Sequence, residues 1–481
     1  MIGAGVGGLS AAVRLAALGH RVTVLEQGAR AGGKCGRTVL EGYSFDTGPS
    51  LLTMPWVFEE LFAATGGPMA DELELLRVEP GTEYRFADGT GVRMGADLPP
   101  TLAALERLSP GAGDDWARVL GACAEMWKAS VPVLSGRAPW PPRRPRPGAP
   151  APDPRDLLRV RPWHTLRTLA RSLCRDPRLR LIVERAATYA GADPRRAPAA
   201  LAVAGYVEHA FGAWHVRGGM YALVEALVRR LEALGGELRL DTAVRSVVRS
   251  GDRVRGVETD EGHLDADAVV ASGDALALHR DLLGAPPGPA AGERSLSGFA
   301  LMLGLRGRTP DLGHHTVLFP RDYDAEFDDV FRHRRPVRDP TLYVSAASAT
   351  DPSQAPEGGE SWFVLVNAPT HGEGLDWDAR AEAYEETILD RLARRGLDVR
   401  ERIEVRARRT PADLERETGA VGGAIYGRAP HGRLGTLGRP ANVSRVARGL
   451  YLAGGTTHPG GGLPLVALSG RIVAEEIGPA R

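Results

Sequence analysis

Apolar and polar residues alternate in two ways along this chain, and each way predicts a different kind of element. Leu223, Leu227 and Leu231 recur every four residues, so they lie on one face of a helix that Gly235 and Gly236 end. Short apolar runs bounded by turn residues predict strands. Strands are expected at 22–26, 237–248, 253–258, 268–272, 299–305, 362–366 and 450–453, and further helices at 9–18, 56–65, 377–394 and 466–477.

The order of these elements predicts an α/β protein with two interleaved domains. A doubly wound parallel sheet of the Rossmann type is expected from three separate segments, 1–75, 205–290 and 435–481. The inserted segments 76–204 and 291–434 are expected to form an α+β substrate-binding domain. Within the first insert, residues 137–154 are rich in proline and arginine, which excludes helix and strand. This loop is either a solvated linker or a contact with an anionic membrane surface.

The glycine pattern at the start of the chain indicates a nucleotide site. Gly3, Gly5 and Gly8 are spaced as in the βαβ fingerprint that binds a dinucleotide, and Glu26 ends the second strand. Gly5 would let the backbone approach a pyrophosphate at the helix N-terminus. Glu26 would accept hydrogen bonds from a ribose hydroxyl and would repel a 2′-phosphate. Only Met1 and Ile2 precede Gly3, where about five residues are usual, so we expect that the first strand is incomplete.

The composition of the chain bears on its partners and on the compartment in which it works. The chain is 43% hydrophobic and 25% charged, and its 60 basic and 60 acidic residues cancel, so nothing favours a nucleic acid partner. Cys35, Cys123 and Cys174 have no metal or redox spacing, which suits a reducing cytoplasm. No apolar run is long enough to cross a membrane and no signal peptide is evident, so any membrane contact is expected to be peripheral.

Further motifs appear in a fixed order along the chain: Gly32-Gly33-Lys34, Phe45-Asp46-Thr47-Gly48-Pro49-Ser50, and a glycine-rich loop from Gly454 to Pro464 that opens the last helix. Lys34 beside two glycines could reach a diphosphate as a point charge, or could belong to a plain surface turn. Together with the first glycine motif and Glu26, this series resembles the FAD-dependent carotenoid desaturases of the amine oxidase superfamily, over nearly the whole chain.

The resemblance implies a noncovalently bound FAD and a set of residues that contact it. The residues expected to hold it are Gly3, Gly5, Gly8, Glu26, Gly33, Lys34, Gly48, Pro49, Ser50, Val244, Gly455, Thr456, Gly462 and Leu463. The implied reaction removes two hydrogens from adjacent carbons of an apolar polyene, one of them as hydride to flavin N5. Residues 52–58, 187–191 and 214–220 look more like the 3,4-desaturases of hydroxylated or methoxylated neurosporenes than like phytoene desaturases.

Candidate catalytic residues are few, because positioning matters more in such a reaction than acid–base groups. His458 is the one imidazole in the glycine-rich loop, and it is either a proton carrier or structural. Arg155 and Asp156 stand where the family has an acid–base candidate, although a helix cap is the favoured interpretation of Asp156. His314 and His315 lack a third ligand at metal spacing and are expected on a strand surface, so no metal is predicted.

Other functions keep the same motifs. A dehydrogenase or isomerase of a bacterial polyene pathway, or an amine-oxidase-like flavin oxidase, would share the fold, and a non-enzymatic prenyl-tail binder would be expected to have lost the flavin contacts. The helix after Leu463 shows no aromatic pair of the kind that cages an amine. Since no second glycine motif for NADPH follows, oxygen or a membrane quinone is the expected electron acceptor of a cytoplasmic enzyme at the membrane surface.

Overall fold

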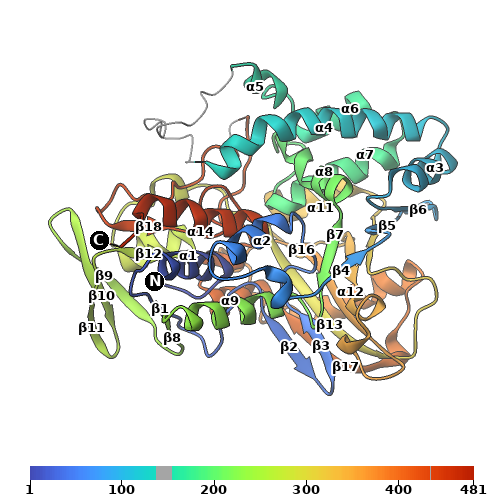
Figure 1. Cartoon of the computed structure of the whole chain (residues 1–481). Coiled ribbons are helices and arrows are strands. Elements are labelled where there is room, and N and C mark those ends of the chain that lie inside the picture. Colours follow the sequence, from blue (N-terminus) through green and yellow to red (C-terminus); the bar gives the residue numbers. More distant parts are fainter. Residues whose placement is uncertain (137–153, 434, 481) are drawn as a thin grey trace.

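Strands from both ends and the middle of the chain form a parallel sheet. The computed structural model describes residues 1–136, 154–433 and 435–480 (Figure 1). Ile2 forms parallel bridges to Leu25 on one side and Ala271 on the other. On the side of Leu25, β1 pairs in parallel with β8. On the side of Ala271, β12 pairs in parallel with β18. The bounds of these strands are β1 Thr23–Leu25, β8 Glu237–Arg239, β12 Val269–Ala271 and β18 Leu450–Leu452.

Three helices cover this sheet. α1 (Val6–Ala17) follows the first strand directly and packs against both α9 (Tyr221–Ala233) and α14 (Leu463–Ile477). Eleven of the 12 residues of α1 are buried, because helices flank it as well as the sheet. A Cβ added to Gly470 of α14 would lie 2.7 Å from the Ala11 backbone nitrogen, so the two helices touch through their backbones. The first and last helices of the chain are thus held together.

A separate antiparallel ribbon lies at the edge of this part of the molecule. It consists of β9 (Val244–Ser250), β10 (Arg253–Thr259) and β11 (Gly262–Asp265). Ser250 pairs with Arg253 across the turn that contains Gly251, so the strands expected on either side of this turn form a hairpin. The ribbon projects away from the helices (Figure 1).

A seven-stranded sheet builds the second half of the molecule. Its order is β17-β13-β16-β15-β14-β5-β6, and only the β14–β5 pair is parallel. The bounds are β5 Thr82–Arg85, β6 Gly91–Met94, β13 Ser297–Arg306, β14 His315–Leu318, β15 Leu342–Ser345, β16 Gly359–Ala368 and β17 Ile403–Arg409. Successive side chains of β13 point to opposite faces. Phe299, Leu301 and Leu303 pack toward α12 (Ala381–Arg394). On the other face, Ala300 and Met302 pack against the hairpin of β2 (Arg37–Leu40) and β3 (Tyr43–Asp46).

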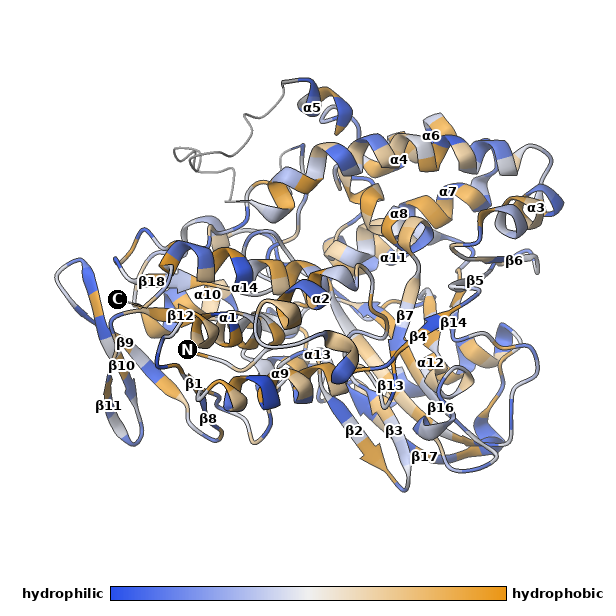
Figure 2. Ribbon diagram, in the orientation of Figure 1, coloured by the Kyte–Doolittle hydropathy of each residue, from blue (hydrophilic) through white to orange (hydrophobic). Residues whose placement is uncertain are grey.

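A layer of helices caps one end of this sheet. Their apolar sides face one another and the sheet, and their polar sides face outward (Figure 2). The layer comprises α3 Leu98–Leu108, α4 Ala112–Ser135, α5 Pro154–Arg159, α6 Leu166–Leu173, α7 Pro177–Glu184 and α8 Ala202–Phe211. The shorter elements are β2 Arg37–Leu40, β3 Tyr43–Asp46, α2 Trp56–Ala63, β4 Leu75–Val78, β7 Ala213–Val216, α10 Ala275–Ala277, α11 Tyr323–Phe327 and α13 Pro411–Thr418.

The mixed α/β prediction is confirmed, and several bounds differ. The strand expected at 237–248 is divided into β8 and β9, which lie in different sheets, and the helix expected at 9–18 begins at Val6. The last helix begins at Leu463 rather than Val466, and the helix expected at 377–394 begins at Ala381. The surface placement of His314 and His315 was wrong. These residues are 4% and 1% exposed, and their rings pack against His215 and Tyr343, respectively. The domain boundaries stay a prediction. Within the described ranges, no helix combines the length and apolarity needed to span a membrane.

Candidate functional site

Four glycine-bearing turns converge at the N-terminal end of α1. Gly5 forms a parallel bridge with Gly32, and the Gly32 amide donates to the Ala4 carbonyl over 2.9 Å. A Cβ added to Gly7 would lie 2.8 Å from the Gly454 Cα, and one added to Gly455 would lie 3.5 Å from the Gly461 Cα. A side chain at Gly7 would therefore push the two segments apart, whereas Gly455 and Gly461 lie at ordinary contact distance. The glycines predicted from the motifs therefore meet in one place.

The geometry at Gly5 fits the close approach of a ligand. Gly5 has ordinary extended dihedral angles, φ −66° and ψ 164°. An added Cβ would meet only the Ser272 hydroxyl, at 3.8 Å, so it would project into open space. The Ser272 Oγ is itself buried without a hydrogen-bond partner among the described residues. No side chain caps the N-terminus of α1 or of α14, which leaves backbone N–H groups available to an anion. The residues present thus fit a diphosphate.

Glu26 anchors the same turn. One carboxylate oxygen accepts from the Ala4 amide over 2.7 Å and the other from the Gly28 amide over 2.9 Å. Each oxygen keeps a second lone pair, which a ribose hydroxyl could use. The Thr242 amide donates to the Glu26 carbonyl over 2.8 Å, which brings the segment leading to Val244, at the start of β9, beside the end of β1.

Lys34 turns away from the glycine turns that surround it in sequence. Its Nζ donates to the carbonyls of Ala424 and Ile425 over 3.0 and 2.6 Å. Burial lowers the pKa of its ammonium to about 8. These contacts indicate that Lys34 links two loops of the protein, rather than binding a diphosphate through its charge. A plain surface turn does not describe Lys34 either, since its amine donates to two backbone carbonyls of a distant loop.

The segment from Asp46 to Ser50 connects the two halves of the molecule. The Asp46 carboxylate accepts from the Met220 and Tyr221 amides, over 2.8 and 3.2 Å, at the start of α9. Burial raises the pKa of this carboxyl to about 6. A Cβ on Gly48 would overlap the Lys34 carbonyl, so this residue must be glycine. Pro49 follows, and the Ser50 Oγ is 2.5 Å from the Tyr343 hydroxyl, which is 2.7 Å from His315 Nδ1.

The loop before α14 is held by contacts that the sequence did not single out. The Thr456 hydroxyl accepts from the Ala275 amide over 3.0 Å. Arg439, 9% exposed, donates to the carbonyls of Tyr426 and Gly455 over 3.2 and 3.1 Å. Leu463, the first residue of α14, is buried behind Gly462. Arg439 stands in a loop without any recognisable motif, so no pattern in the sequence identified it.

His458 has a structural environment. Its Nε2 lies 3.0 and 3.1 Å from the carbonyls of Val133 and Gly136, at the C-terminal end of α4. A ring nitrogen between two carbonyl oxygens must carry the proton and donate it. Burial lowers the pKa of the imidazole to about 4, so it is neutral at physiological pH. These contacts favour the structural interpretation over proton transfer.

Arg155 and Asp156 lie on α5, at the outer edge of the helical layer (Figure 1). Asp156 stands inside the first turn rather than at the N-cap, and it accepts from Arg159 over 2.7 Å. The Arg155 side chain is exposed. The structure therefore does not bring these two residues into contact with His458. Of the proline- and arginine-rich loop, residues 137–153 lie outside the described part of the chain.

The chain belongs to the family of flavin-containing amine oxidoreductases, whose model matches residues 6–478. It is 34% identical to a ζ-carotene-forming phytoene desaturase of Myxococcus xanthus, over 99% of this chain and 93% of that protein. It is 36% identical to a hydroxyneurosporene desaturase of Rubrivivax gelatinosus, over 99% and 92%. It is a flavin-containing oxidoreductase of the carotenoid desaturase type, as the motifs implied.

Solved structures agree on the fold. An oxidoreductase from Methanosarcina mazei superposes with a TM-score of 0.67 at 17% identity, over 98% of this chain and 99% of that one. A variant of putrescine oxidase superposes with a TM-score of 0.65 at 18% identity, over 99% and 97%. At such identities the likeness concerns the fold alone.

Proposed function

We propose that this protein is an FAD-dependent desaturase that introduces carbon–carbon double bonds into a carotenoid or a related apolar polyene. The observation that carries the proposal is the convergence of the glycine turns at Gly5, beside Glu26, in a chain whose relatives are named as carotenoid desaturases. In this proposal the parallel sheet with α1 is a Rossmann-type dinucleotide domain. Gly5, Gly33 and Gly462 line the diphosphate, and Glu26 accepts from the adenosine ribose.

The chemistry divides between cofactor and protein. FAD, when bound, supplies the hydride acceptor. The protein has to hold an apolar chain with its reacting carbon about 3 to 3.5 Å from that acceptor, and to keep water away. The cation left by hydride loss is delocalised over the polyene, so the neighbouring proton is acidic enough to leave to a weak base. The Ser50 hydroxyl, in the segment that follows Gly48, and the Tyr343 hydroxyl of β15, 2.5 Å from it, are proposed as such acceptors.

The cofactor is proposed to be noncovalent. The three cysteines are buried and form no bond with each other, and the His458 Nε2 already donates to backbone carbonyls. Acid precipitation should therefore release the flavin into the supernatant, and flavin that stays in the pellet would contradict this part of the proposal.

Anaerobic reduction of the bound flavin tests the reaction directly. The FAD-loaded protein is mixed with phytoene, neurosporene and 1-hydroxyneurosporene in separate detergent preparations. Loss of the visible flavin absorption together with a red shift of one carotenoid is the expected result, because each new double bond lengthens the conjugated system. A loaded protein whose flavin stays oxidised with all three would point to another polyene or to redox-neutral isomerisation.

A peripheral membrane contact is proposed as well, since the substrates named for the relatives dissolve in lipid rather than in water. The described residues on either side of 137–153 carry three of the exposed large apolar side chains, Val131, Leu158 and Trp163, at 37%, 60% and 52% exposure. Leu158 stands on α5 with exposed Arg155. Apolar side chains among arginines suit an anionic headgroup layer.

Replacing Leu158 and Trp163 together by glutamate should weaken vesicle binding. Each loses apolar contact and gains a repulsive charge, so partitioning should fall by about tenfold or more. Sedimentation with vesicles of phosphatidylglycerol and phosphatidylcholine measures this. Val39→Glu, at a side chain 57% exposed on β2, is the matched control and should sediment like the wild type. Equal sedimentation of the double variant and the control would reject the contact.

A further inference from the structure

A buried arginine lies at the glycine-rich loop before α14 and has no carboxylate partner. Arg439 is 9% exposed. Its Nη1 donates to the carbonyls of Tyr426 and Gly455, over 3.2 and 3.1 Å. No described carboxylate lies within 4.0 Å of the guanidinium, and its Nε and Nη2 have no hydrogen bond to a described residue. The single N–H of Nε and the two of Nη2 are therefore unpaired.

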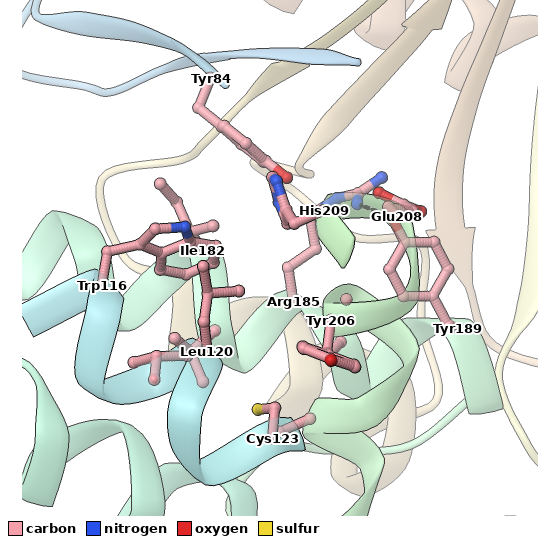
Figure 3. A pocket seen from close by; sticks show the side chains of 15 residues that line it. Tyr84, Trp116, Leu120, Cys123, Ile182, Arg185, Tyr189, Tyr206, Glu208 and His209 are labelled. Carbon is pink, nitrogen blue, oxygen red and sulfur yellow. Dashed lines mark hydrogen bonds between the residues drawn. The ribbon is translucent and has the colours of Figure 1, made fainter. Parts of the chain in front are cut away.

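Every other buried arginine of the described chain has a carboxylate nearby. These are Arg14 with Glu60, Arg230 with Glu72, Arg409 with Glu417, and Arg185 beside Glu208 (Figure 3). The charge near Arg439 is instead that of a second cation, Arg428. Burial lowers the pKa of the Arg439 guanidinium to about 10, so the side chain is charged at neutral pH. Because an uncompensated buried charge is costly, an electron-rich group of a ligand would stabilise this arrangement.

The guanidinium is packed directly on the backbone of the glycine-rich loop. A Cβ added to Gly460, whose φ is +139°, would lie 3.1 Å from the Arg439 Nε. A Cβ added to Gly461 would lie 2.4 Å from the ring of Tyr426, whose carbonyl Arg439 binds. Gly462 then precedes α14, which has no side-chain cap at its N-terminus. The charge of Arg439 and the positive end of this helix thus belong to one loop.

The order of contacts along the first glycine turn relates this loop to the cofactor. Glu26 accepts from the amide that precedes Gly5, over 2.7 Å, whereas Gly7, which follows Gly5, lies against Gly454. In the proposed site the adenosine ribose is at Glu26 and the diphosphate at Gly5. The rest of the dinucleotide then continues toward the loop that begins at Gly454. Arg439 is therefore assigned to the flavin end rather than to the diphosphate.

We propose that Arg439 binds the edge of the flavin ring system formed by N1 and the C2 carbonyl, and that it stabilises reduced FAD more than oxidised FAD. This inference rests on the proposed function for the identity of the cofactor and of the hydride donor. The polyene gives up a hydride and then a proton, and the hydride brings two electrons and one proton to the ring. The ring thereby gains one negative charge, shared by N1 and the C2 oxygen, and a guanidinium binds an anion more strongly than a neutral acceptor. Arg439 thus raises the reduction potential of the bound flavin and makes it a better hydride acceptor.

A redox titration of the holoprotein tests this role without any carotenoid. The flavin is reduced slowly at neutral pH by xanthine and xanthine oxidase, with a viologen mediator, beside a reference dye of known potential. Arg439→Gln keeps an amide donor but removes the charge, and it should weaken the binding of reduced relative to oxidised FAD by at least about tenfold. For a two-electron couple, this lowers the potential by about 30 mV. Arg439→Lys keeps the charge and should retain most of the wild-type potential.

A matched control and a second measurement separate this role from a general loss of structure. Arg230→Gln, on α9, removes an arginine of equal burial that is paired with Glu72, and it should leave the potential unchanged. Flavin content per chain reports whether each variant has folded, and flavin fluorescence measures the affinity of each apoprotein for oxidised FAD. The wild type also gives a test that needs no variant: its potential should lie above that of free FAD. That comparison decides the result where Arg439→Gln retains no flavin.

Equal potentials in the wild type and Arg439→Gln, equal shifts in Arg439→Gln and Arg439→Lys, or a wild-type potential below that of free FAD would each overturn this role. So would a lower affinity for oxidised FAD at an unchanged potential, because the diphosphate carries the same charge in both redox states and would then be what Arg439 binds. A potential that depends on Arg439, in a protein whose flavin no carotenoid reduces, would support the role and reject desaturation. Flavin reduction by a carotenoid, with a potential independent of Arg439, would do the reverse.

Discussion

Replacing Gly5 by valine should give a folded protein that contains no FAD. The dihedral angles at Gly5 are open to any residue, and an added Cβ meets nothing closer than 3.8 Å. The apoprotein should therefore lose little stability. The new methyl groups would fill the space into which a diphosphate has to approach the backbone. Flavin content, measured from the absorbance of the purified protein, should fall by more than about tenfold, the loss expected when bulk fills a phosphate cradle.

Two other glycines make this test specific. Gly121→Val, on the exposed face of α4 where an added Cβ meets nothing within 4 Å, should keep the wild-type flavin content. Gly8→Ala should instead unfold the turn, because its Cβ would lie 2.3 Å from the Gly3 carbonyl oxygen. A Gly5→Val protein that still carries one FAD per chain would show that the cofactor does not pass this turn.

The glycine turn before α1 and its contact with Glu26 were predictable from the sequence because the residues involved are close in the chain. Gly3, Gly5 and Gly8 flank the start of α1. Glu26 follows after one helix and one strand, so the spacing of these residues is enough to bring them together. Lys34 shows the limit of such reasoning. Its acceptors lie 390 and 391 residues further along the chain, and nothing near Lys34 in the sequence indicates them.

The burial of the two histidines and the contacts of Arg185 could not be predicted from the sequence, for the same reason. The pair His314-His315 has a polar pattern, and it is interior because His215 of β7 and Tyr343 of β15, which are distant in sequence, pack against it. Arg185 is one of many arginines in the chain, and its contact with the ring of Tyr343 joins two segments that only the fold brings together. Sequence patterns identify sites made by one turn, whereas a site shared between distant segments has to be seen in the structure.

His458 should make the protein sensitive to acid, and this effect should disappear when the imidazole is removed. The pKa of the ring is about 4 in the folded protein and 6.5 in the unfolded chain. The unfolded chain therefore binds one more proton between these values, so stability falls as pH drops below 6.5 and is unaffected above it. The loss from this one group should be about 2 kcal/mol at pH 5.

Urea unfolding at saturating FAD, followed at pH 7.5 and pH 5, measures this loss for the wild type and for His458→Gln, whose amide can still donate to the Val133 and Gly136 carbonyls. The variant should be less stable at pH 7.5 and should lose about 2 kcal/mol less than the wild type on going to pH 5. His263→Gln should change in the opposite direction, because Glu258 and Asp265 raise the pKa of that exposed histidine. Identical losses in the wild type and His458→Gln would mean that His458 is already charged in the folded protein, and a neutral donor between two carbonyls would then be the wrong description of it.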